Sequence, residues 1–76
     1  MYNLLINYID SEDKEELAFG QHIRISGSEV IKLLNTYKPN KFKGVERFIF
    51  DIQRIDKWNY IIQNIKKTIR IIFLSV

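Results

Sequence analysis

The sequence predicts a single α+β domain over residues 1–76. We expect a four-stranded, mostly antiparallel or mixed sheet with two helices on one face, in the order strand, strand, helix, strand, helix, strand. Apolar residues alternate with polar ones in four segments, which is the period of a strand, and recur every three or four residues in two others, which is the period of a helix. A chain of 76 residues has room for one small core.

The first two predicted strands cover residues 2–9 and 17–25, and their short connection indicates an antiparallel pair. Gly20 is expected to mark a bulge or a close approach of backbones. Alternation in the second strand predicts one face made of Leu17, Phe19, Ile23 and Ile25, and an opposite face made of Ala18, Gly20, His22 and Arg24.

The first helix is predicted from residue 26 onward. Ser26 followed three residues later by Glu29 matches a capping box, in which the serine hydroxyl accepts a hydrogen bond from the backbone of the glutamate. Apolar residues then recur at helical spacing as far as Tyr37, and Pro39 disfavours a helical residue before it. The helix is therefore expected to end near residue 37.

The second half of the chain repeats this pattern. Residues 45–55 alternate as a third strand, with Phe48, Phe50 and Ile52 on its apolar face. A second helix is predicted over residues 57–65 from apolar residues at helical spacing. The alternative is a strand over residues 57–63, which the Ile, Trp and Tyr content favours. Residues 68–76 form the last predicted strand.

The last strand is apolar on both of its faces, which is typical of a strand covered on both sides. Two short helices can cover one face of the sheet, so the other face is expected to bind a second copy of the chain or another partner. We expect Ile72 and Leu74 to make that self-contact. The alternatives are that Ile69, Ile71 and Phe73 lie on the open face, or that the sheet curls on itself with other aromatic residues filling the gap.

Charge is unevenly distributed along the chain. Residues 1–37 carry a net charge of −3 and residues 38–76 a net charge of +6. A basic loop with an aromatic residue is typical of surfaces that bind phosphates and stacked bases. The residues predicted to bind an anionic partner are Lys38, Lys41, Phe42, Lys43 and Arg47. The alternative is a solvated basic rim without a ligand.

The connection between the first two strands is acidic, with five carboxylates and one lysine in residues 10–16. It has no glycine at the sixth position, so it does not match a calcium-binding EF-hand loop. The residues predicted to contact a basic partner are Glu12, Asp13, Glu15 and Glu16. The alternative is a solubilising turn that discourages pairing at the sheet edge.

Several kinds of chemistry have no support in the sequence. The chain has no cysteine, which excludes a disulfide scaffold, a zinc finger and a thiol nucleophile. His22 is the single histidine, so no histidine-rich metal site is expected. A minimal nuclease that uses His22 with a carboxylate is the enzymatic alternative. We expect a protein that is not an enzyme and has no cofactor or metal.

The function expected from these observations is binding. The chain has neither a signal-peptide pattern nor an apolar stretch long enough for a membrane span, so a cytoplasmic protein is expected. We expect a small non-enzymatic binding protein that is oligomeric and occludes a partner macromolecule. The frequent Ile, Lys and Asn residues, typical of AT-rich genomes, suggest a phage or mobile-element inhibitor of a host defence system. The alternative is a protein that binds or sequesters nucleic acid or a nucleotide through residues 38–47.

Overall fold

The structure, a computed structural model, describes residues 1–55 and 68–74. Its strands are β1 (Tyr2–Asp10), β2 (Glu16–Ile25), β3 (Val45–Arg54) and β4 (Thr68–Leu74). One α-helix, α1 (Gly27–Thr36), and a short 3₁₀ turn at Pro39–Lys41 connect β2 to β3. The predicted α+β class is confirmed for this part of the chain, with four strands at the predicted places.

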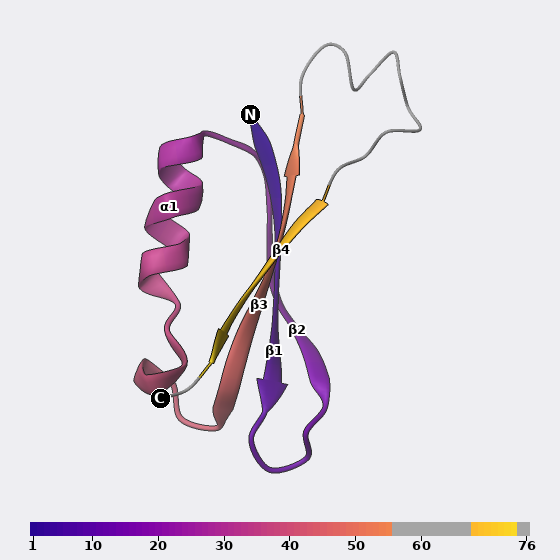
Figure 1. Cartoon of the computed structure of the whole chain (residues 1–76), viewed down its shortest axis with the longest axis vertical. Coiled ribbons are helices and arrows are strands. Elements are labelled where there is room, and N and C mark those ends of the chain that lie inside the picture. The colour runs from indigo at the N-terminus through magenta and orange to yellow at the C-terminus, as the bar shows by residue number, and fades with distance from the viewer. Residues whose placement is uncertain (56–67, 75–76) are drawn as a thin grey trace.

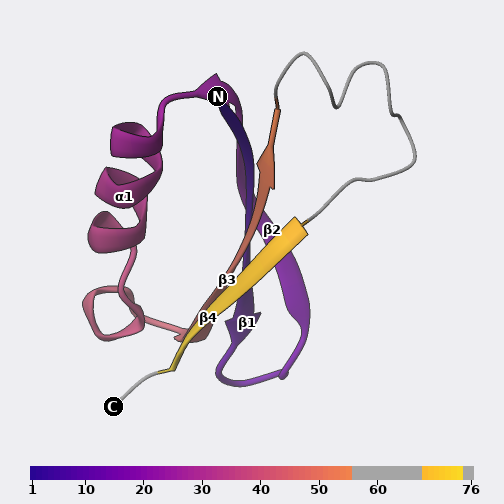
Figure 2. The ribbon, with the colours of Figure 1, turned by 45° about the horizontal axis from the view of Figure 1, so that its top comes forward.

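The four strands form one sheet in the order β2-β1-β3-β4, and every neighbouring pair is antiparallel. Because β1 lies between β2 and β3 in the sheet, the connection through α1 crosses over β1. Figures 1 and 2 show α1 on one side of the sheet, with no described helix on the other side. One face of the sheet is therefore covered and the other is uncovered.

The second half of the chain differs from the prediction in its helices. The second helix predicted over residues 57–65, and the strand alternative over residues 57–63, lie outside the described residues. The structure describes one helix where two were predicted on one face, and β4 is the antiparallel neighbour of β3, so the sheet of the described residues is entirely antiparallel.

The helix begins as the sequence predicts. The backbone N–H of Glu29 donates to the hydroxyl of Ser26 over 3.2 Å, and this satisfies one of the donors that a helix start leaves open. The Ser26 hydroxyl also lies 3.0 Å from that of Ser28. Val30 is buried, and Leu33 and Leu34 pack against the core. These spacings place one side of α1 on the sheet.

The core lies between α1 and the middle strands. Leu4 and Ile6 of β1 and Phe48 and Phe50 of β3 are at most 1% exposed. Around them pack half-buried side chains from all four strands and from α1, Ile71 and Phe73 of β4 among them. The predicted apolar face of the third strand is therefore confirmed, and of the two arrangements considered for the last strand, the one with Ile71 and Phe73 facing the helix is correct.

The edge strand β2 departs from the predicted alternation. Its pairing with β1 is irregular at two places, one next to Gly20 and one between His22 and Ile25. The bulge expected at Gly20 is confirmed. The extra residue next to Gly20 places His22 opposite the buried Leu4, and Ile23, the next residue, is 61% exposed. The predicted faces are therefore wrong for His22 and Ile23, and also for Gly20, which stands opposite the buried Ile6. An extra residue in one strand reverses the side on which the next side chains lie.

Candidate binding surfaces

The uncovered face of the sheet combines exposed apolar side chains with amides and one ion pair. Side chains alternate between the two faces of a strand, so the residues between the core positions lie here. Leu5 of β1 is 40% exposed and Ile72 of β4 is 47% exposed. Ile49 of β3, which stands opposite Asn7 of β1 and Ile72 of β4, is 6% exposed. This face is thus neither a closed core nor a fully solvated surface.

The ion pair on this face joins β3 to β4. Arg70 donates from Nε and from a terminal nitrogen to the two carboxylate oxygens of Asp51, over 2.7 and 2.9 Å. Such a two-point contact fixes the guanidinium geometry. The hydrogen bond to Asp51 raises the pKa of Arg70 above its ordinary value. The two charges therefore neutralise one another in the middle of the face.

Next to this pair the face is hollowed. The hollow has a volume of about 310 Å³ and is shallow and open. It spans the four strands near the start of β1, and its lining consists of Asn3, Leu4, Leu5, Gln21, Asp51, Gln53 and Thr68. These residues offer amide groups and a carboxylate that is already paired with Arg70. We find no nucleophile and base in contact in this lining that could catalyse a reaction.

The two residues predicted for self-contact both lie on β4. Ile72 is on the uncovered face and is exposed, as predicted. Leu74 ends β4 and stands opposite Arg47 in the register. On the other side of β4, Ile69 is 63% exposed. The edge strand therefore exposes an isoleucine on each of its faces.

The five residues of the predicted basic surface do not form one patch. Phe42 is half-buried in a cluster of aromatic rings on the covered side, next to Phe48. Arg47 precedes Phe48 in the strand and therefore lies on the opposite face, where it pairs with Glu46 over 3.4 Å. The Nζ of Lys38 lies 3.9 Å from the centre of the Phe73 ring. Lys41 and Lys43 are exposed.

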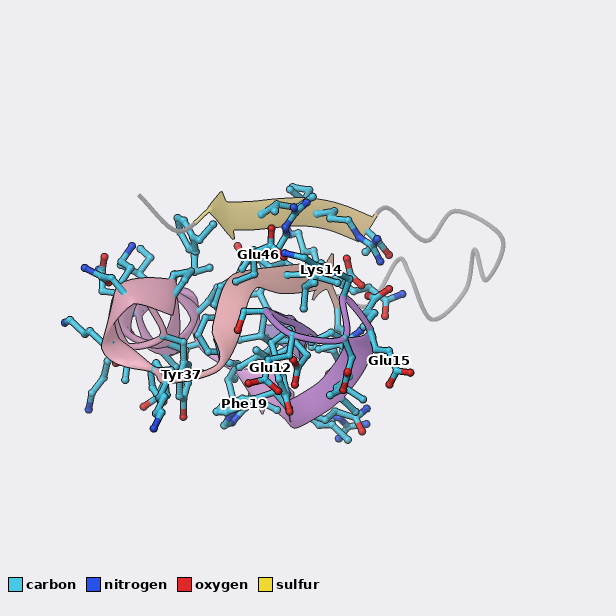
Figure 3. The ribbon with its side chains drawn as sticks, turned by 90° about the horizontal axis from the view of Figure 1, so that it is seen from below. Glu12, Lys14, Glu15, Phe19, Tyr37 and Glu46 are labelled. Atoms are coloured by element: carbon cyan, nitrogen blue, oxygen red, sulfur yellow. The ribbon has the colours of Figure 1, made fainter. Side chains whose placement is uncertain are left out.

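The aromatic cluster itself was not predicted as a site. It joins residues from four elements or loops, with ring centres 5.0–6.1 Å apart between Phe19 and each of Tyr37, Phe42 and Tyr8. Phe19 remains 38% exposed at the edge of this cluster. Figure 3 shows Phe19 and Tyr37 at the end of the molecule seen from below. Sequence spacing gave no signal for this convergence, because these residues are far apart in the chain.

A second hollow, of about 340 Å³, opens beside this cluster. Its aromatic walls are Tyr8, Phe19, Phe42 and Phe48, and Asp10, Lys43 and Gly44 are among the other lining residues. An aromatic wall next to a lysine can stack a planar group and attract an anion. The hollow thus offers the chemistry that the sequence predicted for residues 38–47, with Phe42 and Lys43 as its contributors from that range.

The predicted acidic residues lie in and beside the turn between β1 and β2. Glu12, Asp13, Glu15 and Glu16 are all exposed, and Figure 3 shows Glu12 and Glu15 on this side of the molecule. Asp10 shapes the turn, because its carboxylate accepts hydrogen bonds from the backbone of Glu12 and Asp13 over 2.7 and 3.2 Å. The role of the four exposed residues in contacting a basic partner stays a prediction.

An ion pair ties this turn to the third strand. Lys14, which has a positive φ of 57°, reaches Glu46 over 2.6 Å. The hydrogen bond from Lys14 is the main reason that the pKa of Glu46 lies below its ordinary value. The backbone N–H of Ser11 also donates to the carbonyl of Gly44 over 3.0 Å. The turn is therefore held against the start of β3.

His22, the candidate for nuclease chemistry, is half-buried on β2 opposite Leu4. The alternation of the sheet places it on the covered side, over a core residue, which is an apolar setting for a general base. Within residues 1–55 and 68–74, no three acidic or histidine side chains come together in a way that could hold a metal ion.

Comparisons with protein-family models, with curated proteins and with solved structures find no match to this chain. Among the described residues, α1 is too short to cross a membrane, and no other helix has the required length and apolar character.

Proposed function

We propose that this chain is a non-enzymatic binding protein that associates with a second copy of itself and occludes a partner macromolecule. The observation that carries the proposal is the exposure of Ile69 and Ile72 on the two faces of the edge strand β4. Complete burial of an isoleucine side chain contributes about 1.5–3 kcal/mol. A second copy brings a patch of the same composition, and a two-fold dimer would shield both isoleucines in each chain.

Electrostatics support a contact between like chains at this place. The single charged residue of β4 is Arg70, and its charge is neutralised by Asp51 on the neighbouring strand β3. Two copies can therefore approach through β4 as long as their two arginines do not stand directly opposite one another. The mixed character of the neighbouring surface, with Leu5 beside amides, is also typical of interfaces between proteins.

The test is the mass of the full chain in solution, measured by sedimentation over a range of concentrations. We expect a dimer that Ile72→Lys converts to a monomer. Ile31→Lys is the matched control, because Ile31 is 60% exposed on α1, away from the sheet. A monomeric wild-type chain at every concentration, or equal effects of the two substitutions, would contradict the proposal.

A second candidate function is the binding of nucleic acid or a nucleotide. The observation that favours it is the hollow with walls from Phe19 and Phe42 and with Lys43 in its lining. Binding to phosphates would weaken steeply as the salt concentration rises, because each phosphate contact releases bound counterions.

A titration of a labelled single-stranded oligonucleotide tests this candidate at several salt concentrations. Lys43→Ala should reduce both the affinity and the salt dependence, whereas Lys32→Ala, on the exposed side of α1, should change neither. The absence of any binding at low salt would remove the candidate. It would leave the self-association proposal intact, since that is measured without nucleic acid.

A further inference from the structure

The two edges of the described sheet differ in their regularity. At one edge, β2 pairs with β1 through two irregularities, and Arg24 has a positive φ of 54°. At the other edge, all seven residues of β4 pair with β3 in one continuous register. Bulges and charged residues protect an edge from pairing with another strand, and β2 has the bulges. By this criterion β4 is the edge that is open to a further strand.

The composition of β4 adds to this difference. An edge strand directs alternate backbone N–H and C=O groups away from its neighbour. Within the described residues, β4 has β3 on one side and no strand on the other. It contains one charged residue, Arg70, and five apolar ones. A regular, apolar strand of this kind is a template for antiparallel pairing.

We propose that β4 pairs antiparallel with β4 of a second copy about a two-fold axis at Ile71, and so joins the two sheets into one. This inference rests on the proposed self-association and specifies its geometry. With the axis at Ile71, all seven residues of the strand find a partner. Thr68 then stands opposite Leu74 of the second copy, Ile69 opposite Phe73, and Arg70 opposite Ile72.

Charge supports the same register. If the axis is perpendicular to the joined sheet, paired residues must lie on the same face, so the nearest alternatives place the axis at Arg70 or at Ile72. An axis at Arg70 would place the two arginines directly opposite one another, and like charges in that position are destabilising. An axis at Ile72 would place the exposed Ile69 opposite position 75, a serine, which would shield it less than Phe73 does. The axis at Ile71 avoids both costs.

Exposure agrees with this arrangement. Ile69, on the covered side, would lie against Phe73 of the second copy, and Ile72, on the uncovered side, against the stem of Arg70. Both exposed isoleucines of β4 would thus be shielded by directly opposite side chains, whose Cβ atoms stand about 4.5–5.5 Å apart in an antiparallel pair.

Disulfide trapping tests the register, because the chain has no cysteine of its own. Full-length Arg70→Cys and Ile72→Cys are mixed and oxidised, and the products are identified by mass. We expect the mixed disulfide to form at least about tenfold faster than either homodimer, since residues on the diagonal stand about 7–8 Å apart and a disulfide requires Cα atoms within about 6.8 Å.

Arg70→Cys removes the ion pair with Asp51 and could destabilise the fold, so a second variant that keeps this pair is also tested. Ile71→Cys alone should form a disulfide with its own copy, since Ile71 lies on the axis. If the wild-type chain is a dimer but these disulfides form no faster than the homodimers of Arg70→Cys and of Ile72→Cys, the register is wrong and self-association stands. If the wild-type chain is a monomer, the proposed function itself fails.

Discussion

The covered and uncovered faces of the sheet are built from the same two central strands, yet their side chains differ sharply in exposure. On the covered side, Phe48 and Phe50 are fully buried. On the uncovered side, Leu5 is 40% exposed although it stands between two core residues of β1. An apolar residue in a strand therefore shows only that this position can be buried. The side of the sheet on which α1 packs determines which of these residues are buried.

The largest effect expected from this comparison is on stability. Phe50→Ala should lower the free energy of unfolding by about 3–5 kcal/mol, because the substitution leaves a cavity in the core. That is a large fraction of the about 5–15 kcal/mol typical of a folded domain. Leu5→Ala should cost less than about 1 kcal/mol in the monomer, since the side chain is already partly in water. Urea denaturation followed by circular dichroism measures both, and equal losses would show that the two faces are equivalent.

Ile49 is an exception to the difference in exposure between the two faces, because it lies on the uncovered face and is nevertheless buried. Its neighbours in the register are Asn7 and Ile72. Ile49→Ala should cost about 2 kcal/mol, at the lower end of the range for core isoleucines, because water can enter the space from one side. Ile31→Ala on the exposed side of α1 is the control and should change stability by less than about 1 kcal/mol. A negligible effect at Ile49 would mean that the uncovered face contributes nothing to folding.

Loss of the cap of α1 should have a smaller effect on stability. The cap stabilises the helix that covers one face of the sheet and leaves the other uncovered. Ser26→Ala should lower the free energy of unfolding by about 1 kcal/mol, because it removes the acceptor for the Glu29 N–H. Ser11→Ala, at an exposed position of the β1–β2 turn, should be close to neutral. A loss at Ser11 equal to that at Ser26 would contradict the role of the cap.

Much of this fold follows from local patterns in the sequence. Alternation located the four strands of the described chain within one or two residues at most ends, and Ser26 with Glu29 located the start of α1. These signals are local, because a capping hydroxyl and its donor are three residues apart, and a strand's alternation is visible within about six residues. Within the described residues, the elements that carry such local signals lie where the sequence predicts them.

The remaining errors concern relations between distant residues. Nothing in the spacing of β3 and β4 indicates whether they are neighbours, because that depends on which edge of the sheet the chain returns to. The exposure of Ile23 was also missed, since a single extra residue in β2 changes the face without changing the composition. The cluster around Phe19 depends on both, as it gathers rings from segments that only the completed sheet brings together.

The smallest expected effect concerns the ion pair between the β1–β2 turn and β3. Because the pKa of Glu46 is lowered in the folded chain, its contribution to stability is present at neutral pH and is lost as the pH falls through that pKa. Lys14→Met should raise the pKa of Glu46 toward its ordinary value, as it removes the hydrogen bond that is the largest cause of the shift. NMR titration of the carboxyl groups measures this directly, with Lys41→Met as a control that leaves the pKa of Glu46 unchanged.

Added salt should also reduce the difference in the pKa of Glu46 between wild type and Lys14→Met, because exposed charges are screened. A Glu46 pKa that does not respond to Lys14→Met would mean that the turn is held by its backbone bonds alone, such as the one from Ser11 to Gly44.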